Sequence, residues 1–183
     1  MKKFILIFCQ IFIFFSCTTK PRIPQTEQEM KENLIQESEA YSNAYVEMDA
    51  KKIVHYTNEY YVKDQGGSDV FLALLQKSAL TMKERGDRFL EIKLSQPEKF
   101  IRCDSGLYCV LKQSTSEIFG IGSKKPYEFS SLVIANSPDS GIHWKFLGIY
   151  RFDEEMIKKY IPGFSMKEFG LKTVSKKKSQ PAQ

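Results

Sequence analysis

The spacing of apolar residues changes at Gly86, and this change limits the folds open to the chain more than any other feature. Before Gly86, apolar residues recur at helical spacing, which predicts helices over 27–49, 50–57 and 68–85. Segment 58–67 interrupts the spacing and ends in two glycines, so we expect a loop there. After Gly86 the period falls to two, as in half-buried strands. Helices therefore come first and strands second.

The ends of the expected helices carry capping signals. Asp49 is a candidate N-cap for helix 50–57, and Ser68 for helix 68–85. Asp69, in the first turn, suits the positive end of the helix dipole, and Gly86 is a typical C-terminal stop. The expected buried stripe of helix 68–85 consists of Val70, Phe71, Leu74, Leu75 and Met82.

The second half predicts a meander of strands and a closing helix. In the first strand, Leu90, Ile92 and Leu94 face one way. A helix over 153–161, capped by Asp153, follows the last strand. The expected strands are 89–95, 99–102, 107–115, 127–136 and 143–152.

This element order predicts an α+β fold, in which N-terminal helices pack on a curved, mostly antiparallel sheet and a C-terminal helix closes the domain. No internal repeat is visible. We expect a signal peptide over 1–16, a lipidated cysteine and tether over 17–28, a single domain over 29–172, and a disordered tail over 173–183.

The N-terminal residues resemble a bacterial lipoprotein signal. Lys2 and Lys3 precede the segment 4–15, which is apolar except for Gln10 and too short to span a bilayer, and Ser16 then precedes Cys17. The resemblance implies that Cys17 is lipidated and holds an exported protein on a membrane of the cell envelope. An ordinary secretory signal with a chance cysteine is the alternative.

Two residues refine this resemblance. Phe14 stands where lipoprotein signals commonly have Leu, which is a departure from the pattern. Thr18 stands where an Asp would resemble the inner-membrane retention signal of enteric bacteria, so an outer-membrane destination is favoured.

The net charge comes from the ends of the chain. The sequence has 27 basic and 22 acidic side chains, and removing Lys2, Lys3 and the four lysines of segment 172–178 leaves 21 against 22. No basic stripe with interleaved aromatic residues is present. We therefore expect no nucleic-acid partner.

Cys103 and Cys109 flank the turn-like stretch DSGLY, residues 104–108. An exported protein can oxidise such a pair, and a hairpin of this length can accept a bridge. We favour a disulfide between them over two free thiols. No His or further Cys lies nearby in sequence, so no metal site is expected.

The octapeptide SPDSGIHW, residues 137–144, resembles the Asp-box of sialidase propellers. A propeller needs several copies, and this short chain has one. Asp139 can accept local backbone hydrogen bonds, Gly141 permits positive φ, and Ser137 and Trp144 can bond and pack locally. We therefore expect a structural turn between two strands.

Three segments carry a second resemblance: AYSNAYVEMDAKKIVHYTNEYY at 40–61, GGSDVFLALL at 66–75 and HWKFLGIY at 143–150. Their order resembles the nuclear-transport-factor-2-like superfamily, a cone-shaped α+β fold, over about residues 29–150. The resemblance implies either a small lyase or isomerase with a polar residue inside the cone, or a domain that only binds ligands or partners.

Candidate catalytic side chains are few, and we assign none. His55 ends the second expected helix, where a base is one interpretation and contact with solvent or a carbonyl the other. His143 alternates with Trp144, so it points out of the core if Trp144 points in. Asp64 and Asp69 suit turns and caps, and Glu128 could lie on either face.

The residues that we expect to line a pocket are Tyr45, Tyr60, Trp144 and Phe146, because aromatic side chains suit both pocket walls and core edges.

The leading hypothesis is a membrane-anchored, non-catalytic module that binds a small apolar ligand or an envelope protein, with no cofactor. A small lyase or isomerase is the alternative. A structural accessory protein of an envelope complex is another, and it would expose an apolar patch, with candidates on the closing helix: Met156, Ile157, Tyr160 and Ile161.

Overall fold

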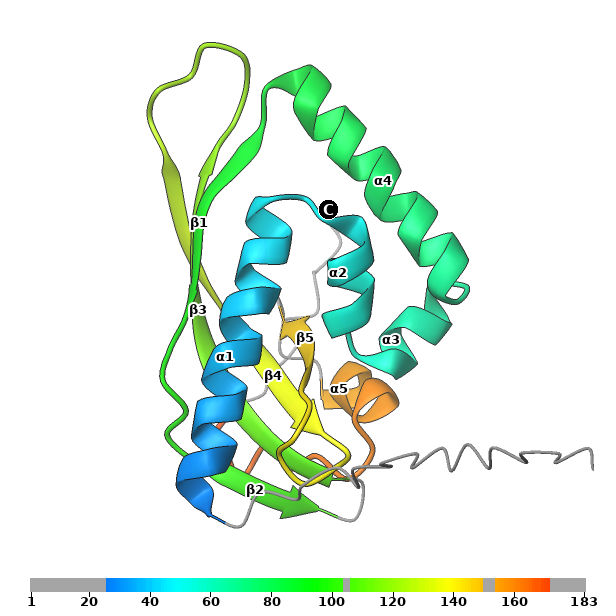
Figure 1. The fold of residues 1–183 in the computed structure, drawn as a ribbon, viewed down its shortest axis with the longest axis vertical. Helices are drawn as coiled ribbons and strands as arrows, with labels where there is room; N and C mark the ends of the chain where they lie inside the picture. Colours follow the sequence, from blue (N-terminus) through cyan, green and yellow to red (C-terminus); the bar gives the residue numbers. More distant parts are fainter. Residues whose placement is uncertain (1–25, 104–105, 150–153, 172–183) are drawn as a thin grey trace, which may run out of the picture.

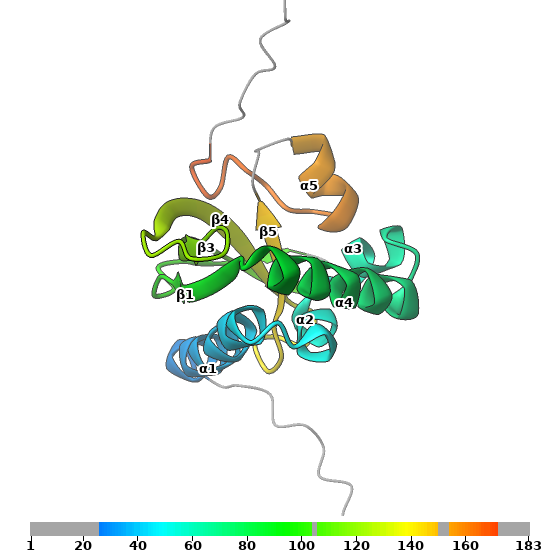
Figure 2. The ribbon, with the colours of Figure 1, turned by 90° about the horizontal axis from the view of Figure 1, so that it is seen from above.

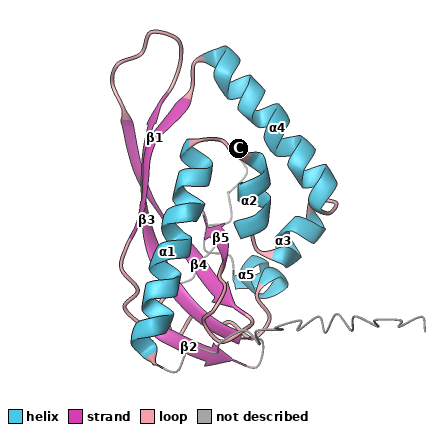
Figure 3. Ribbon diagram, viewed as in Figure 1, coloured by secondary structure: helices cyan, strands magenta, loops and turns pink. Residues whose placement is uncertain are grey.

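The computed structural model describes residues 26–103, 106–149 and 154–171. Four helices precede the sheet and one follows it (Figures 1 and 3), which confirms the α+β fold class. The helices are α1 (Glu27–Val46), α2 (Ala50–Tyr56), α3 (Glu59–Asp64), α4 (Ser68–Arg85) and α5 (Glu154–Tyr160). The strands are β1 (Arg88–Leu94), β2 (Phe100–Cys103), β3 (Gly106–Ile118), β4 (Tyr127–Ser137) and β5 (Lys145–Ile149).

The sheet is antiparallel and curved, and its order is β1-β3-β4-β5. β3 is long enough to pair β2 along its first residues and β1 along its last. A register shift between Phe89 and Glu91 gives β1 a bulge, which leaves Leu90 44% exposed. The hairpin expected from β2 to β3 is confirmed.

Helices cover both faces of the sheet. Seen from above, α1 and α2 lie on one side and α5 on the other (Figure 2). The core under α1 consists of Leu34, Tyr41, Leu107, Cys109, Leu111, Val133, Ala135, Trp144 and Phe146. The core under α5 consists of Tyr108, Ile134, Leu147, Ile149, Ile157, Tyr160, Ile161, Phe164 and Met166. Alternate residues of β3 and β4 enter opposite cores, as the pleat requires.

Local hydrogen bonds explain where the helices begin. Thr26 and Glu29 form a capping box at α1, and Asp49 caps α2 as predicted by accepting from Lys52 N at 3.1 Å. The loop predicted over 58–67 is wrong, because Asn58 accepts from Tyr61 N at 3.1 Å and starts α3.

Helix α4 departs furthest from its prediction. Ser68 is its first residue rather than its cap, and Gly67, the N-cap, makes no side-chain capping bond. Of the expected stripe, only Phe71 is buried, whereas Val70 is 49% and Leu74 47% exposed. The stripe was wrong because α4 lies away from the sheet, beside α2 and α3 (Figure 1).

Gly86 ends α4 with φ +76°, as predicted for a helix C-terminus. A Cβ at this position would lie 2.7 Å from the backbone N of Ile121, in the loop between β3 and β4. Glycine therefore serves both the left-handed conformation and the close approach of that loop.

The octapeptide forms the β4–β5 turn, which confirms the structural interpretation. Ser137 Oγ donates to Asp139 Oδ1 at 2.7 Å and accepts from Gly141 N at 2.8 Å. Asp139 Oδ1 also accepts from His143 N at 3.0 Å. Gly141 has φ +97°, and a Cβ there would lie 2.6 Å from Met30 Cγ in α1.

Several predictions fall outside the described residues. These are the signal peptide, Cys17, the tether up to residue 25, the cap at Asp153, the end of the last strand and the tail from 173. Within the described ranges, no helix combines the length and apolar character needed to cross a bilayer.

Candidate ligand cleft beneath helix α4

A cleft of about 740 Å³ lies between α4 and the rest of the helical layer. This volume is within the range of small-molecule sites. Its apolar lining is Val46, Met48, Ala50, Ala79, Leu80, Met82 and Phe89, and its other lining residues are Glu47, Gln76, Lys83, Gly86, Asp87 and Arg88.

The connection between α1 and α2 forms one wall of this cleft. α1 ends at Val46, and Met48 adopts φ +52°, which is uncommon for a residue other than glycine. The Asp49 cap then starts α2 at Ala50. This short connection places Val46, Met48 and Ala50 on one wall, opposite Ala79 and Leu80 of α4.

The charged residues of the cleft differ in their partners. Asp87 Oδ1 accepts from Gly120 N at 2.8 Å, and its Oδ2 lies 2.6 Å from Arg85 Nη2. The Gly120 hydrogen bond, followed by that of Arg85, lowers the pKa of Asp87. Among the described residues, the side chains of Lys83 and Arg88 form no ion pair or hydrogen bond.

Glu117 of β3 pairs with Phe89 of β1 and is buried, with 8% of its surface exposed. Burial, together with the charge of Asp87, raises the pKa of Glu117. The carboxylates of Glu117 and Asp87 are therefore close together, but both oxygens of Asp87 already have partners, Gly120 N and Arg85.

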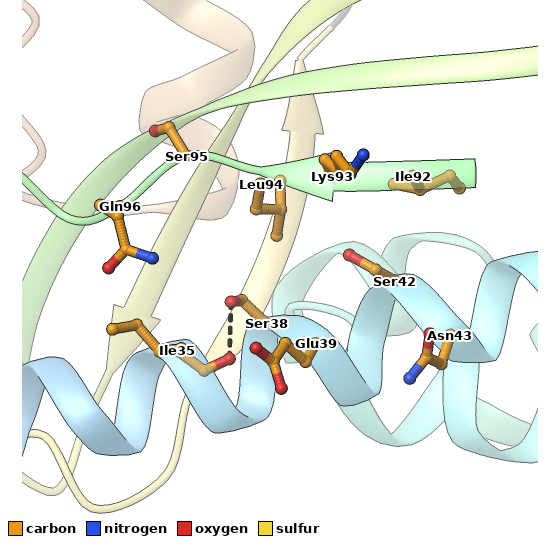
Figure 4. A pocket seen from close by; sticks show the side chains of 10 residues that line it. All are labelled: Ile35, Ser38, Glu39, Ser42, Asn43, Ile92, Lys93, Leu94, Ser95 and Gln96. Atoms are coloured by element: carbon orange, nitrogen blue, oxygen red, sulfur yellow. Dashed lines mark hydrogen bonds between the residues drawn. The ribbon is translucent and has the colours of Figure 1, made fainter.

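A second hollow of about 320 Å³ lies between α1 and β1 (Figure 4). Its walls are mostly polar: Ser38, Glu39, Ser42, Asn43, Lys93, Ser95 and Gln96 accompany Ile35, Ile92 and Leu94. Ser38 Oγ donates to Ile35 O at 2.8 Å, and Ser95 Oγ accepts from Lys112 N at 3.1 Å. This hollow is less suited to an apolar ligand than the cleft beneath α4.

The four predicted pocket residues do not share one site. Tyr45 and Phe146 line a cavity of about 350 Å³ together with Tyr61 and Met156. Tyr60 is 57% exposed on α3 and lines a different hollow.

Trp144, the fourth predicted pocket residue, is a core residue with 1% of its surface exposed, and its ring lies 5.7 Å from that of Phe100. Its Nε1 is buried and has no hydrogen-bond acceptor among the described residues.

Both histidines lie at the surface. His55 is exposed at the end of α2, and its carbonyl accepts from Lys145 Nζ at 2.5 Å. The side chain of His143 is 70% exposed, and its Nδ1 lies 3.2 Å from Glu37 Oε1. Trp144 points in and His143 points out, as predicted from their alternation.

The acidic candidates also have structural surroundings. Asp64 Oδ1 accepts from Lys159 Nζ at 2.6 Å, and Oδ2 accepts from Tyr160 Oη at 2.7 Å. These hydrogen bonds, that of Lys159 first, lower the pKa of Asp64. Asp69 is exposed in the first turn of α4, and Glu128 is exposed on β4.

The predicted disulfide does not form in this structure. Cys109 is buried with a free thiol, and it pairs with Phe100 in the β2–β3 ladder, whereas Cys103 pairs with Gly106. The odd offset puts the two side chains on opposite faces: Cys109 enters the core under α1, and Cys103 packs on the core under α5.

The apolar residues proposed for an exposed patch on the closing helix are largely internal. Ile157 and Ile161 are buried at 0% and 1% exposure, and Tyr160 at 7%. Met156 is half-buried against the same core. Exposed apolar side chains gather instead on α4 and around the β3–β4 loop: Val70, Leu74, Leu80, Phe119, Ile121 and Tyr127.

The cleft residues were not predicted from the sequence, because an apolar stripe on a helix does not show which other element packs against it. Met82 belongs to the expected stripe of helix 68–85 and Met48 to the expected helix 27–49, and in the structure both line the cleft. No local signal in the sequence groups these residues into one site.

The described residues contain no cluster of three or more His, Cys, Asp or Glu side chains able to hold a metal ion. No protein-family model matches the chain, and no curated protein matches it.

Proposed function

We propose that this protein is an exported, membrane-anchored lipoprotein whose domain binds a small apolar ligand in the cleft beneath α4. The observation that carries the proposal is the size and lining of that cleft. Seven apolar residues line about 740 Å³ between α4 and the α1–α2 connection. Apolar surface that the fold leaves uncovered favours an apolar occupant, because burying it releases water.

A binding role suits the chemistry better than catalysis. His55 and His143 are exposed at the surface, and Asp64 is held by Lys159 and Tyr160. A general base needs a place within hydrogen-bond reach of a bound substrate. None of these three residues lines the cleft.

The anchor is part of the proposal and rests on the sequence. Cys17, behind a short apolar run and Ser16, is the proposed lipidation site, with the outer membrane as the favoured destination. The order of helices and strands supports the resemblance to the nuclear-transport-factor-2-like superfamily, which is also part of the proposal.

One experiment tests both the anchor and the ligand. The Cys17→Ser variant, produced in a host that lipidates such signals, is expected in the soluble rather than the membrane fraction. Native mass spectrometry of this released protein should show excess mass that disappears on denaturation. Adding Ala79→Trp should abolish the excess mass, because the indole ring occupies the cleft.

Lys77→Gln, on α4 but outside the lining, is the matched control and should retain the excess mass. Continued membrane attachment of Cys17→Ser would contradict the anchor. Excess mass that survives Ala79→Trp unchanged would place the ligand elsewhere, and a bare mass in every variant would count against ligand binding.

A further inference from the structure

Two cationic side chains line the cleft and have no anionic partner among the described residues. Lys83, in the last turn of α4, and Arg88, the first residue of β1, both line it. The Gly86 turn joins their two elements, so both cations come from the same end of α4. Neither side chain is engaged by another described residue, either through an ion pair or through a hydrogen bond.

Each acidic residue of the same cleft already has a cationic partner. Asp87 is engaged by Arg85 and by Gly120 N, and 6% of its side chain is exposed. Glu47 lies 3.6 Å from Lys52 Nζ. Formal charges in the lining balance, but the available charge is positive, because only the cations lack partners.

The stability of α4 accounts for a cationic residue at only one of these two positions. A lysine in the last turn of a helix interacts favourably with the helix dipole, so Lys83 has a structural role without any ligand. Arg88 lies in a strand and has no such role. An arginine beside apolar surface offers a planar set of donors that matches a carboxylate or a phosphate.

We propose that the ligand of this cleft is a single-chain amphiphile with an anionic head group, carboxylate or phosphate. Its chain lies against the apolar residues between α4 and the α1–α2 connection, and its head group pairs with Lys83 and Arg88. This inference rests on the proposed function, because it names the chemical class of the molecule bound there.

Methionine side chains in different parts of the structure can report where a ligand binds. Met48 and Met82 line the cleft, whereas Met156 lines the cavity next to Tyr45 and Met30 packs against Gly141. In the full chain labelled with ¹³C at the methionine methyl groups, NMR resolves these sites. Binding to another part of the chain leaves Met48 and Met82 unshifted.

Four probes share one chain length and differ in head group: decanoate, decyl phosphate, decanol and decyltrimethylammonium. Decanoate or decyl phosphate should shift Met48 and Met82 at the lowest concentration, and the stronger of the two identifies the head group. Decanol should bind more weakly and the cation weakest. The preference for the anions should shrink as salt is added.

The double variant Lys83→Gln/Arg88→Gln should weaken anion binding about tenfold, as expected for two exposed ion pairs, and leave decanol unchanged. Lys77→Gln is the control and should change neither. If decanoate and decanol bind with equal affinity and the double variant changes neither, the proposal of an anionic head group is wrong. The proposal that the cleft binds an apolar ligand would still hold. If no probe shifts Met48 or Met82, both proposals fail.

Discussion

Cys109 points from β3 into the core under α1, while its neighbour Tyr108 points into the core under α5. A single step along a strand therefore decides the environment of each side chain. Burial raises the pKa of the Cys109 thiol to about 12. A thiol with such a pKa remains protonated, and therefore unreactive, near neutral pH.

The state of Cys109 can be measured by thiol labelling without reduction. Native protein should show no labelling at Cys109 at pH 8, and denatured protein should show it, because unfolding removes the burial that raises the pKa. Comparison with Cys109→Ser, which should have one reactive thiol fewer after denaturation, identifies the residue. If denatured protein is labelled at Cys109 only after reduction, the predicted Cys103–Cys109 disulfide does form.

At the level of elements, one carboxylate joins two helices that are far apart in sequence. Asp64, the last residue of α3, accepts hydrogen bonds from Lys159 and Tyr160 of α5. These bonds lower the pKa of Asp64 below its ordinary value of 3.8. The interaction therefore stabilises the fold above that ordinary pKa and is lost as the pH falls through the lowered pKa.

Asp64→Asn should accordingly lower stability at neutral pH, and the difference from the wild type should shrink in acid as Asp64 becomes protonated. Chemical unfolding between neutral pH and pH 3 measures this difference. Glu128→Gln removes the same charge at an exposed position of β4 and is the control. A difference for Asp64→Asn that does not change with pH would show that the carboxylate charge does not hold α5.

The elements that were predicted correctly are those whose signals are local. Asp49 caps α2, Gly86 ends α4 and Asp139 organises the β4–β5 turn through bonds to residues a few positions away. The α4 stripe depended on contacts between distant segments. Periodicity indicated that α4 has an apolar face, but it could not show that the sheet lies elsewhere.

The candidate site shows the same limit. Tyr45 and Phe146 do share a cavity, because both belong to elements packed at the core edge. The larger cleft beneath α4 depends on how far α4 lies from α1, a distance that no local pattern encodes. Its residues were visible in the sequence, but their grouping was not.

On the scale of the whole molecule, α1 and α4 are held differently. Leu34, Tyr41 and Ala44 bury α1 against the sheet, whereas Phe71 is the one buried residue of α4. A helix with little buried apolar surface opens at low free-energy cost. If the cleft is a ligand site, its occupant supplies the packing that α4 lacks.

Hydrogen–deuterium exchange of the full chain, with and without decanoate or decanol, tests this most directly. Without a ligand, we expect the amides of α4 to exchange much faster than those of α1; a bound probe should slow exchange in α4 and leave α1 unchanged. Equal protection of both helices without a ligand, or no response of α4 to either probe, would contradict the account of the cleft as a binding site.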